Sequence, residues 1–331
     1  MSGQSLSISV VIPAYDAATT MAECLDALNN QSLSRDDYDV IVVDDGSTDG
    51  TADIAGRCGA RVLKQANSGA ASARNTGIAE ASGDIILFTD SDCSPAPDWM
   101  QEMLAPFADP QIVGVKGVYR TRQTSLAARF IQIEYEDRYD WALRYQYVDF
   151  VDTYAAAYRR DVIVAAGGFD TSLRWLHDQE LSFRLAAMGC KMVFNPHAAV
   201  YHHHPDSWRK YAWRKYRIGY WKTRVLSLYP DKALRDSHTP LALKVQMVLG
   251  VFSVPLALLA PWTKLWAWLL GIVTGVFILS ASPFVVKAWR RDRPVALVSL
   301  PALYVRAWAL GLGLLAGYMD AWRRRSPQRV S

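Results

Sequence analysis

The chain has 331 residues, a hydrophobic fraction of 51% and a formal net charge of +4. The hydrophobic fraction is high for a soluble protein, so the excess apolar residues need a place outside an ordinary soluble core. Charge is divided unevenly, because residues 1–204 carry 16 Lys and Arg against 27 Asp and Glu, whereas residues 205–331 carry 20 against 5. An acidic front half suits a domain that holds a divalent cation. A basic, apolar back half suits the anionic face of a membrane, and it argues against nucleic acid as the partner.

Cysteine usage and the first residues indicate a cytosolic setting. The four cysteines lie singly, without CxxC spacing, so neither a zinc site nor a disulfide framework is indicated. Residues 1–12 have no basic start, and their apolar run is too short for a signal peptide. We therefore expect the N-terminal domain to remain in the cytosol.

Short apolar runs alternate with helical patterns along the first ninety residues. The runs are Ile8–Ile12, Val40–Val43, Arg61–Leu63 and Ile85–Phe88. This alternation predicts an α/β fold with a parallel, doubly wound sheet. In such sheets ligands bind outside the carboxyl ends of the strands. The residues that follow the runs are therefore candidate ligand contacts: Pro13, Ala14, Tyr15 and Asp16, then Asp44–Ser47, then Thr89–Cys93.

Two acidic segments follow buried-type strands. Asp44 and Asp45 would bring carboxylates to the ligand edge, where they can accept hydrogen bonds from a base N–H or a ribose hydroxyl; the alternative is a turn and a helix cap. Asp90-Ser91-Asp92 has a spacing of two, which puts both carboxylates on one side of an extended chain. Oxygen ligands of this kind suit Mg²⁺ or Mn²⁺ bridging two phosphates, although surface turns contain the same pattern.

A small-residue stretch, residues 67–77, opens a helix between these segments. Asn67 and Gly69 would let a ligand approach closely, with Arg74 near a diphosphate. No GxxxxGK[ST] motif occurs, and the glycine pattern at 311–317 lies in the apolar tail without a preceding strand. P-loop and NAD-binding functions are therefore excluded.

The alternation ends after Val118, and the residues beyond it resemble an acceptor-side subdomain. It is expected to contain a segment rich in Tyr, Arg and Glu at 130–147, a run at 154–158 that begins with Tyr154, and a helix from about Asp178 to Met188 that follows Trp175. Two further runs, 192–194 and 198–201, are predicted strands that close the sheet.

A histidine cluster follows the second of these runs. On a strand His202 and His204 would face one way and His203 the other. One imidazole would bias a metal site toward Mn²⁺, and His202 is the candidate ligand, with an ordinary surface cluster as the alternative.

Four motifs in this order resemble the family 2 glycosyltransferases of GT-A fold, a Rossmann-like mixed or parallel sheet. They are Ile12–Tyr15, Asp44–Ser47, Ala73–Gly77 and Asp90–Asp92, and the resemblance continues through 168–170 and 175–185 to about residue 204. It implies a nucleotide-sugar donor, most commonly of uridine, a divalent metal, and inversion at the anomeric carbon. The implied donor contacts are Pro13, Ala14, Tyr15, Asp16, Asp44, Asp45, Asn67, Gly69, Arg74, Asp90 and Ser91, and the metal ligands are Asp90, Asp92 and His202.

The family carries a Glu-Asp pair ahead of the helix near residue 178, and its aspartate is the general base. Here the pair is His177-Asp178, so we expect Asp178 to be the base. His177 either tunes the protonation of Asp178 or packs. Glu180 and Arg184 orient the helix or the acceptor, or form an exposed i,i+4 pair.

The intact base position bears on the acceptor. A phosphate oxygen is already ionised near pH 7 and needs no base, so Asp178 points to a hydroxyl. We expect a sugar hydroxyl on a polyprenyl-diphosphate-linked saccharide or glycolipid, in the assembly of cell-surface polysaccharide or glycan. The alternatives are a polyprenyl-phosphate glycosyltransferase, or a catalytically silent membrane protein that binds nucleotide-sugars.

The C-terminal third is expected to attach the protein to the inner (plasma) membrane. Ser207–Leu228 alternates aromatic and basic residues, which predicts an interfacial helix within a connector at 205–240. Two uncharged runs, about 245–263 and 265–286, are each near the length that spans a bilayer, so they predict a hairpin; buried core helices are the alternative.

The third apolar segment, 295–319, contains Arg306, which would cost roughly 2.5–3.5 kcal/mol at the bilayer centre. We expect a re-entrant or surface-lying pair of short helices bent near Pro301 or Arg306, with the arginine facing protein or lipid phosphate. A simple third span is the alternative. The expected domains are thus 1–204 for catalysis, 205–240, a membrane region at 241–322, and a basic cytosolic tail at 323–331.

Overall fold

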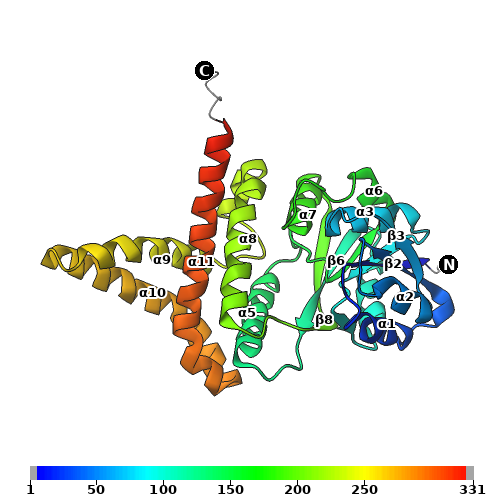
Figure 1. Ribbon diagram of the computed structural model, residues 1–331, viewed down its shortest axis with the longest axis horizontal. Helices are drawn as coiled ribbons and strands as arrows, with labels where there is room; N and C mark the ends of the chain where they lie inside the picture. Colours follow the sequence, from blue (N-terminus) through cyan, green and yellow to red (C-terminus); the bar gives the residue numbers. More distant parts are fainter. Residues whose placement is uncertain (1–5, 326–331) are drawn as a thin grey trace. The chain divides into compact units, whose positions relative to one another are not determined.

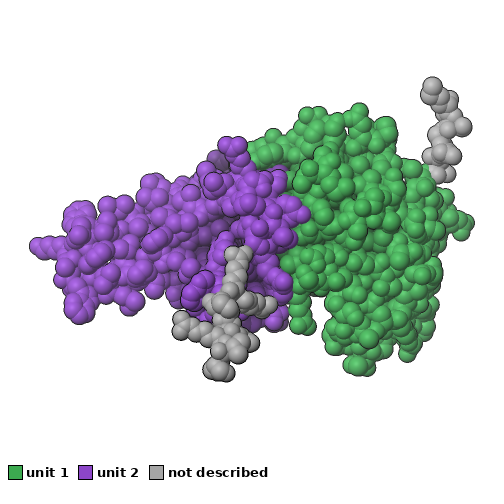
Figure 2. Space-filling view, turned by 90° about the horizontal axis from the view of Figure 1, so that it is seen from above, with its two compact units in different colours: residues 1–122, 142–203 green, residues 123–141, 204–331 purple. Residues whose placement is uncertain are grey.

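The computed structural model describes residues 6–325, and the chain divides into two compact units (Figure 2). Unit 1 comprises residues 1–122 and 142–203, and unit 2 comprises residues 123–141 and 204–331. The sequence indicated one boundary near residue 204. The structure also assigns most of helix α5 (Leu126–Ala142) to unit 2, because that helix packs with the C-terminal helices. The tail expected at 323–331 lies largely outside the described residues.

Unit 1 is built on one mixed sheet, which has eight strands among the described residues (Figure 1). The spatial order is β3-β2-β1-β4-β7-β6-β8-β5. Strands β1 to β4 pair in parallel, whereas β7 is antiparallel to both β4 and β6. The alternation in the sequence therefore predicted the first half of the sheet, and the second half is mixed. The strands are β1 (Ile8–Ala14), β2 (Tyr38–Asp44), β3 (Arg61–Lys64), β4 (Ile85–Thr89), β5 (Cys93–Pro95), β6 (Ile112–Arg120), β7 (Ala155–Arg159) and β8 (Lys191–His202).

The apolar runs form the core of this sheet. Every residue of β1 and β4 is buried, as β-branched and other apolar runs covered on both faces should be. Gly77 lets helix α3 approach β1, since a Cβ there would collide with Val11. The helices of unit 1 are α1 (Met21–Asn29), α2 (Thr51–Arg57), α3 (Ala70–Glu80), α4 (Trp99–Leu104), α6 (Arg160–Ala165) and α7 (His177–Ala187), with short 3-10 turns η1 (Arg35–Asp37) and η2 (Ala105–Ala108).

Strand β8 corrects the sequence analysis, which expected two strands at 192–194 and 198–201. One strand covers both, and it pairs with β6 through a register shift. Lys116 lies opposite Phe194, while Val118 lies opposite Ala199. The skipped residues include Pro196, which has no N–H to give to the ladder, so a bulge carries the strand past it.

Unit 2 consists of helices. Besides α5 they are α8 (Trp208–Leu228), η3 (Pro230–Ala233), α9 (Leu241–Leu259), α10 (Lys264–Arg291) and α11 (Arg293–Arg325). Helices α9 and α10 form the expected hairpin, and α8 lies alongside α11 (Figure 1). Within the described residues three helices are long and apolar enough to cross a membrane: Leu241–Leu259, Lys264–Arg291 and Arg293–Arg323. The first two leave about four fifths of their apolar windows exposed, being 22% and 17% buried, which suggests membrane association.

Helix α11 contradicts the expected pair of short bent helices, since it is one helix with Pro301 inside it. Arg306 does face protein, as expected: its Nη1 donates to Glu134 at 3.1 Å and its Nη2 to Gln246 at 2.5 Å. Partners from α5 and α9 thus bind the two terminal nitrogens of the guanidinium within protein. Whether α11 crosses the membrane remains a prediction.

The glycines at 311–317 serve helix packing. A Cβ on Gly313 would collide with the backbone oxygen of Tyr216, and one on Gly317 would meet that of Tyr220. Small residues let two helices approach closely. The glycine pattern that failed as a nucleotide fingerprint therefore marks where α11 packs against α9, at Gly311, and against α8, at Gly313 and Gly317.

Candidate active site

The carboxyl ends of β1, β2 and β4 meet at one edge of the sheet of unit 1. Ala14, the last residue of β1, lies opposite Asp44, the last residue of β2, and Asp90 follows β4 directly. Because these strands are parallel, the segments chosen from the sequence come together at this edge.

Loops after β1 and β2 are held by their own polar side chains. Asp16 has a φ of 45°, in the left-handed region, and its Oδ1 accepts the Thr48 N–H at 2.9 Å. Asp44 Oδ1 accepts the Ser47 N–H at 3.1 Å. Pro13 and Ala14 are buried, whereas Tyr15 is 53% exposed. Its ring is therefore the part of this segment most open to a ligand.

Asp45 stabilises the loop before α3, a structural role that the sequence did not reveal. Its carboxylate accepts hydrogen bonds from Gln65 Nε2 at 2.7 Å, the Ser68 N–H at 2.9 Å and the Gly69 N–H at 2.8 Å. These bonds fix the loop that leads into α3. Gly69 adopts a φ of 91°, which favours glycine, and Asn67 is exposed on the same loop.

Arg74 connects α3 to the acidic segment after β4. It is buried, and its Nη2 donates to Asp90 Oδ1 at 2.5 Å. Its Nη1 lies 2.8 Å from His177 Nε2 at the start of α7. One cation thus joins the candidate metal ligand Asp90 to the residue beside the candidate base.

The acidic segment has the donors of a divalent metal site. Ligand atoms of Asp90, Asp92 and Cys93 all lie within 4.8 Å of one another, and His202 Nε2 lies 3.3 Å from Asp92 Oδ2. Burial, with Asp92 and Asp90 close by, raises the pKa of Cys93, so its thiol is a poor ligand. Two carboxylates and an imidazole fit Mn²⁺, and the carboxylates alone fit Mg²⁺. Ser91, half-buried between the two aspartates, completes the segment.

The three histidines separate. Strand β8 ends at His202, so the alternation expected for 202 and 204 does not extend to His204. His202 is buried beside Tyr119, with 4.3 Å between ring centroids. His203 is exposed, 3.8 Å from Glu23 Oε2. His204 belongs to unit 2, where its ring stacks on Tyr135.

Asp178 lies in the first turn of α7, behind an unusual backbone turn. Leu176 has a φ of 62°, a conformation that a bulky residue adopts at a cost and that is often found at functional sites. Asp178 Oδ1 accepts the Gln179 N–H at 2.8 Å. Burial and then the nearby Asp152 raise the pKa of Asp178 to about 7, although part of the residue is exposed. A carboxylate in this state can accept a proton near neutral pH.

His177 both packs and contacts the site. Its ring meets Phe169 edge-on, with 5.8 Å between centroids. Burial and the adjacent Arg74 lower the pKa of His177 to about 3. The imidazole is therefore neutral, and it offers Arg74 no counter-charge where the family has a carboxylate.

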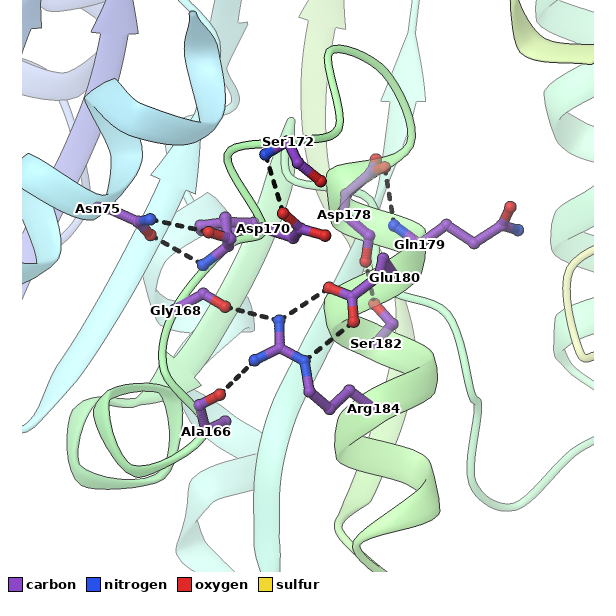
Figure 3. Close-up of polar contacts among 11 residues, drawn as sticks. Asn75, Ala166, Gly168, Asp170, Ser172, Asp178, Gln179, Glu180, Ser182 and Arg184 are labelled. Atoms are coloured by element: carbon purple, nitrogen blue, oxygen red, sulfur yellow. Dashed lines mark hydrogen bonds and ion pairs between the residues drawn. The ribbon is translucent and has the colours of Figure 1, made fainter. Parts of the chain in front are cut away.

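Glu180 and Arg184 hold the loop between α6 and α7 (Figure 3). They form a double ion pair, at 3.0 and 2.8 Å, and Arg184 also donates to the backbone oxygens of Ala166 and Gly168. Glu180 is buried, so the pair is not the exposed one considered from the sequence. Of the other acceptor-side candidates, Tyr154 is buried against Tyr119 and Trp175 is half-buried.

Comparison with known proteins gives consistent relatives. Residues 9–165 match the family described as Glycosyl transferase family 2. The pre-mycofactocin glycosyltransferase of Mycobacterium tuberculosis is 29% identical over 235 residues, which cover 68% of this chain and 48% of the relative. The chain thus spans about half the length of that protein. Glycosyltransferase AglE of Haloferax volcanii is 39% identical over 100 residues, 28% of this chain and 33% of the relative.

Solved structures share the fold. The mannosyltransferase PcManGT from Pyrobaculum calidifontis, solved in complex with GDP-Man and Mn²⁺, has a TM-score of 0.60 at 21% identity; the match covers 98% of this chain and 89% of that one. Residues 1–349 of TarS from S. aureus give a TM-score of 0.51 at 17% identity, over 96% and 92% of the two chains. At these identities the likeness concerns the fold alone.

Proposed function

Since the chain belongs to glycosyltransferase family 2 and has the GT-A fold, we propose that it transfers a sugar from a nucleoside diphosphate sugar to a hydroxyl group. The observation that carries the proposal is Asp178, a carboxylate whose pKa is raised to about 7 at the same site as the paired aspartates 90 and 92. A base near its own pKa at working pH is the most effective in proton transfer.

Donor binding is assigned to the edge formed by β1, β2 and β4. Tyr15 and the loop that Asp45 holds would contact the nucleoside of a donor, commonly UDP-sugar, and Arg74 would help to bind the diphosphate. Mn²⁺ or Mg²⁺ would be held by Asp90 and Asp92, with His202 as a further ligand of Mn²⁺. Such an ion supplies positive charge to the departing nucleoside diphosphate.

The proposed step is a single displacement. Asp178 takes the proton of the acceptor hydroxyl while its oxygen bonds to the anomeric carbon. The bond to the nucleoside diphosphate breaks on the opposite face, so the configuration inverts and no carboxylate nucleophile is required.

The proposed acceptor is a sugar hydroxyl on a polyprenyl-diphosphate-linked saccharide or glycolipid at the cytosolic face of the inner membrane. Support comes from the three long apolar helices and from the excess of 15 positive charges over residues 205–331, where 20 Lys and Arg stand against 5 Asp and Glu. A polyprenyl-phosphate acceptor is the second candidate, and it predicts that Asp178 is dispensable. A silent nucleotide-sugar-binding protein would consume no donor.

The test is donor consumption by the full chain in detergent, with a panel of nucleotide-sugars and Mn²⁺. We expect one donor to be consumed, and Asp90→Ala and Asp92→Ala to abolish both transfer and metal-dependent donor binding. Asp84→Asn is the control, because Asp84 binds Ser7 at the amino end of β4. Consumption at the wild-type rate with EDTA present would overturn the metal assignment.

Membrane topology has its own test. We propose that α9 and α10 cross and return, which leaves Lys287, Arg290, Arg291 and Arg293 on the cytosolic side. A reporter that is active only outside the cytoplasm, fused to Ser331, should stay silent. A strong signal would show that α11 crosses as a third span.

A further inference from the structure

A groove runs between α8 and α11 in unit 2, and neither the proposed reaction nor the core of the unit uses it. Its volume is about 800 Å³, within the range of sites that hold small ligands. From Ser207 to Tyr216 it runs about 13 Å along α8 at the rise of an α-helix. Farther along both helices the glycine contacts, such as Gly313 against Tyr216, bring the backbones together. The groove therefore lies along the same two helices, before the segment in which glycine brings their backbones together.

The lining has two chemical parts. Its walls are apolar and aromatic, and they include Trp213, Tyr216, Trp308 and Leu312. Trp213 is 56% exposed and Trp308 40% exposed, so large rings stand open to the surroundings. Near the start of α8 the lining instead carries Arg209 and Lys210, both exposed. The basic end of the groove can therefore bind an anionic group, and the apolar remainder can bind a hydrocarbon chain.

We propose that this groove binds one anionic phospholipid of the membrane, with its phosphate at Arg209 and Lys210 and an acyl chain along Trp213 and Trp308. Charge complementarity supports this occupant, since residues 205–331 carry 20 basic against 5 acidic residues. The groove belongs to the unit that carries the three apolar helices, so lipid is the abundant ligand around it. Indole rings also favour the headgroup level of a bilayer.

The occupant would link two helices that the sequence separates by about a hundred residues. An acyl chain between Trp213 and Trp308 buries rings that water would otherwise meet. The headgroup then sets selectivity, because a zwitterionic lipid offers the same chain but less net attraction to Arg209 and Lys210.

The experiment counts lipids retained by the detergent-solubilised full chain in native mass spectrometry, with phosphatidylglycerol or phosphatidylcholine of identical chains. We expect one retained phosphatidylglycerol per chain and at least tenfold weaker retention of phosphatidylcholine. Ala309→Trp, which fills the groove, should abolish retention, whereas Ala267→Trp, the same change at an exposed position of α10, should not. Arg209→Ala with Lys210→Ala should remove the preference between headgroups and keep the fold.

A second measurement covers the case in which Ala309→Trp does not fold. Phosphatidylglycerol brominated on its chains should quench wild-type tryptophan fluorescence saturably, and Trp213→Leu and Trp308→Leu should each reduce the saturable part. Equal retention of both headgroups, retention that survives Ala309→Trp, or displacement of phosphatidylglycerol by equimolar polyprenyl phosphate would each overturn the assignment. Displacement by polyprenyl phosphate would indicate that the groove binds the polyprenyl chain of the acceptor instead.

Discussion

Burial acts on one carboxylate in each unit, the partly exposed Asp178 and the fully buried Glu134, and the pKa values of the two shift in opposite directions. Asp178 in unit 1 has a pKa raised to about 7 by burial and by the nearby Asp152. Glu134 in unit 2 is also buried, but Lys215 at 2.8 Å and Arg306 at 3.1 Å outweigh its burial and hold its pKa below the usual range. Tyr211 also donates to it at 3.2 Å.

The difference shows that burial alone does not decide the charge of a side chain. Desolvation penalises the ionised form at both positions, and only Glu134 has enough cations to offset it. Its carboxylate forms ion pairs that join α5 to α8 and α11. Asp178 keeps a proton affinity near neutrality because Arg74, the cation that lowers its pKa, donates its hydrogen bond to Asp90 and lies against His177 instead. A carboxylate whose desolvation is not offset by cations lowers the stability of the protein, but its raised pKa is what a general base requires.

The largest expected effect is on turnover. Asp178→Asn keeps the shape of the side chain but cannot accept a proton, so we expect turnover to fall by about 10²–10⁴-fold while donor affinity changes little. Glu134→Gln should leave turnover per folded molecule almost unchanged. Initial rates and donor binding by calorimetry separate the two. Equal losses of affinity and rate in Asp178→Asn would make Asp178 a binding residue.

Stability should respond in the reverse order. Glu134→Gln leaves buried cations without their counter-charge, and breaking such a cluster costs about 3–5 kcal/mol. The control is Asp140→Asn on the same helix, because Asp140 is 64% exposed and its pair with Lys287 should contribute less than about 1 kcal/mol. Thermal unfolding in detergent measures both. Similar midpoints for the two variants would mean that the buried cluster does not stabilise unit 2.

Asp178→Asn should stabilise the protein at high pH. The folded pKa of Asp178 is raised, so the native state favours the proton and stability is lost as pH rises from about 4 toward 7. Asparagine has no charge to bury, and the variant should unfold several degrees higher than wild type at pH 8, with a smaller difference at pH 5. The stability that Glu134 contributes has the opposite pH dependence. Its pKa is lowered in the folded state, so this contribution is lost only as pH falls below about 4. A lower unfolding midpoint for Asp178→Asn than for wild type at pH 8 would contradict the raised pKa of Asp178.

The smallest expected effect concerns the residue before the base. His177→Glu places the family's carboxylate beside Asp178, which should raise the pKa of Asp178 and shift the rising limb of the pH–rate profile upward by up to about one unit. His177→Gln is neutral, like the imidazole it replaces, and should leave the limb in place. An unchanged profile in His177→Glu would indicate that Arg74 neutralises the added charge completely.

Local features of the sequence were predictable, and distant pairings were not. Strands β1, β2 and β4 and the α9–α10 hairpin follow from short-range hydrophobic pattern. The partners of Glu134 lie 81 residues away at Lys215 and 172 residues away at Arg306, and no periodicity links them. Arg306 in an apolar stretch signalled that some partner must exist, but α5 offers several acidic residues at similar spacing.

The site shows the same division. Sequence order placed the acidic segments at strand ends because strand ends are a local property. It did not show that the carboxylate of Asp45 would accept hydrogen bonds from the loop around Gly69. Nor did it show that Leu176 would adopt a positive φ before α7. Both depend on how loops close in three dimensions, and the only signal in the sequence was the glycine at 69.

The pH dependence of kcat/KM, followed from about pH 5 to pH 8.5 with metal saturating, tests the role of Asp178 most directly. We predict a limb that rises with pH and has an apparent pKa at or somewhat below 7 in the wild type, because the raised pKa of Asp178 controls the fraction of active base. The residual activity of Asp178→Asn should show no such limb. A limb near pH 4, the ordinary range of a carboxyl, or a neutral limb that survives in Asp178→Asn would contradict the assignment of Asp178 as the general base.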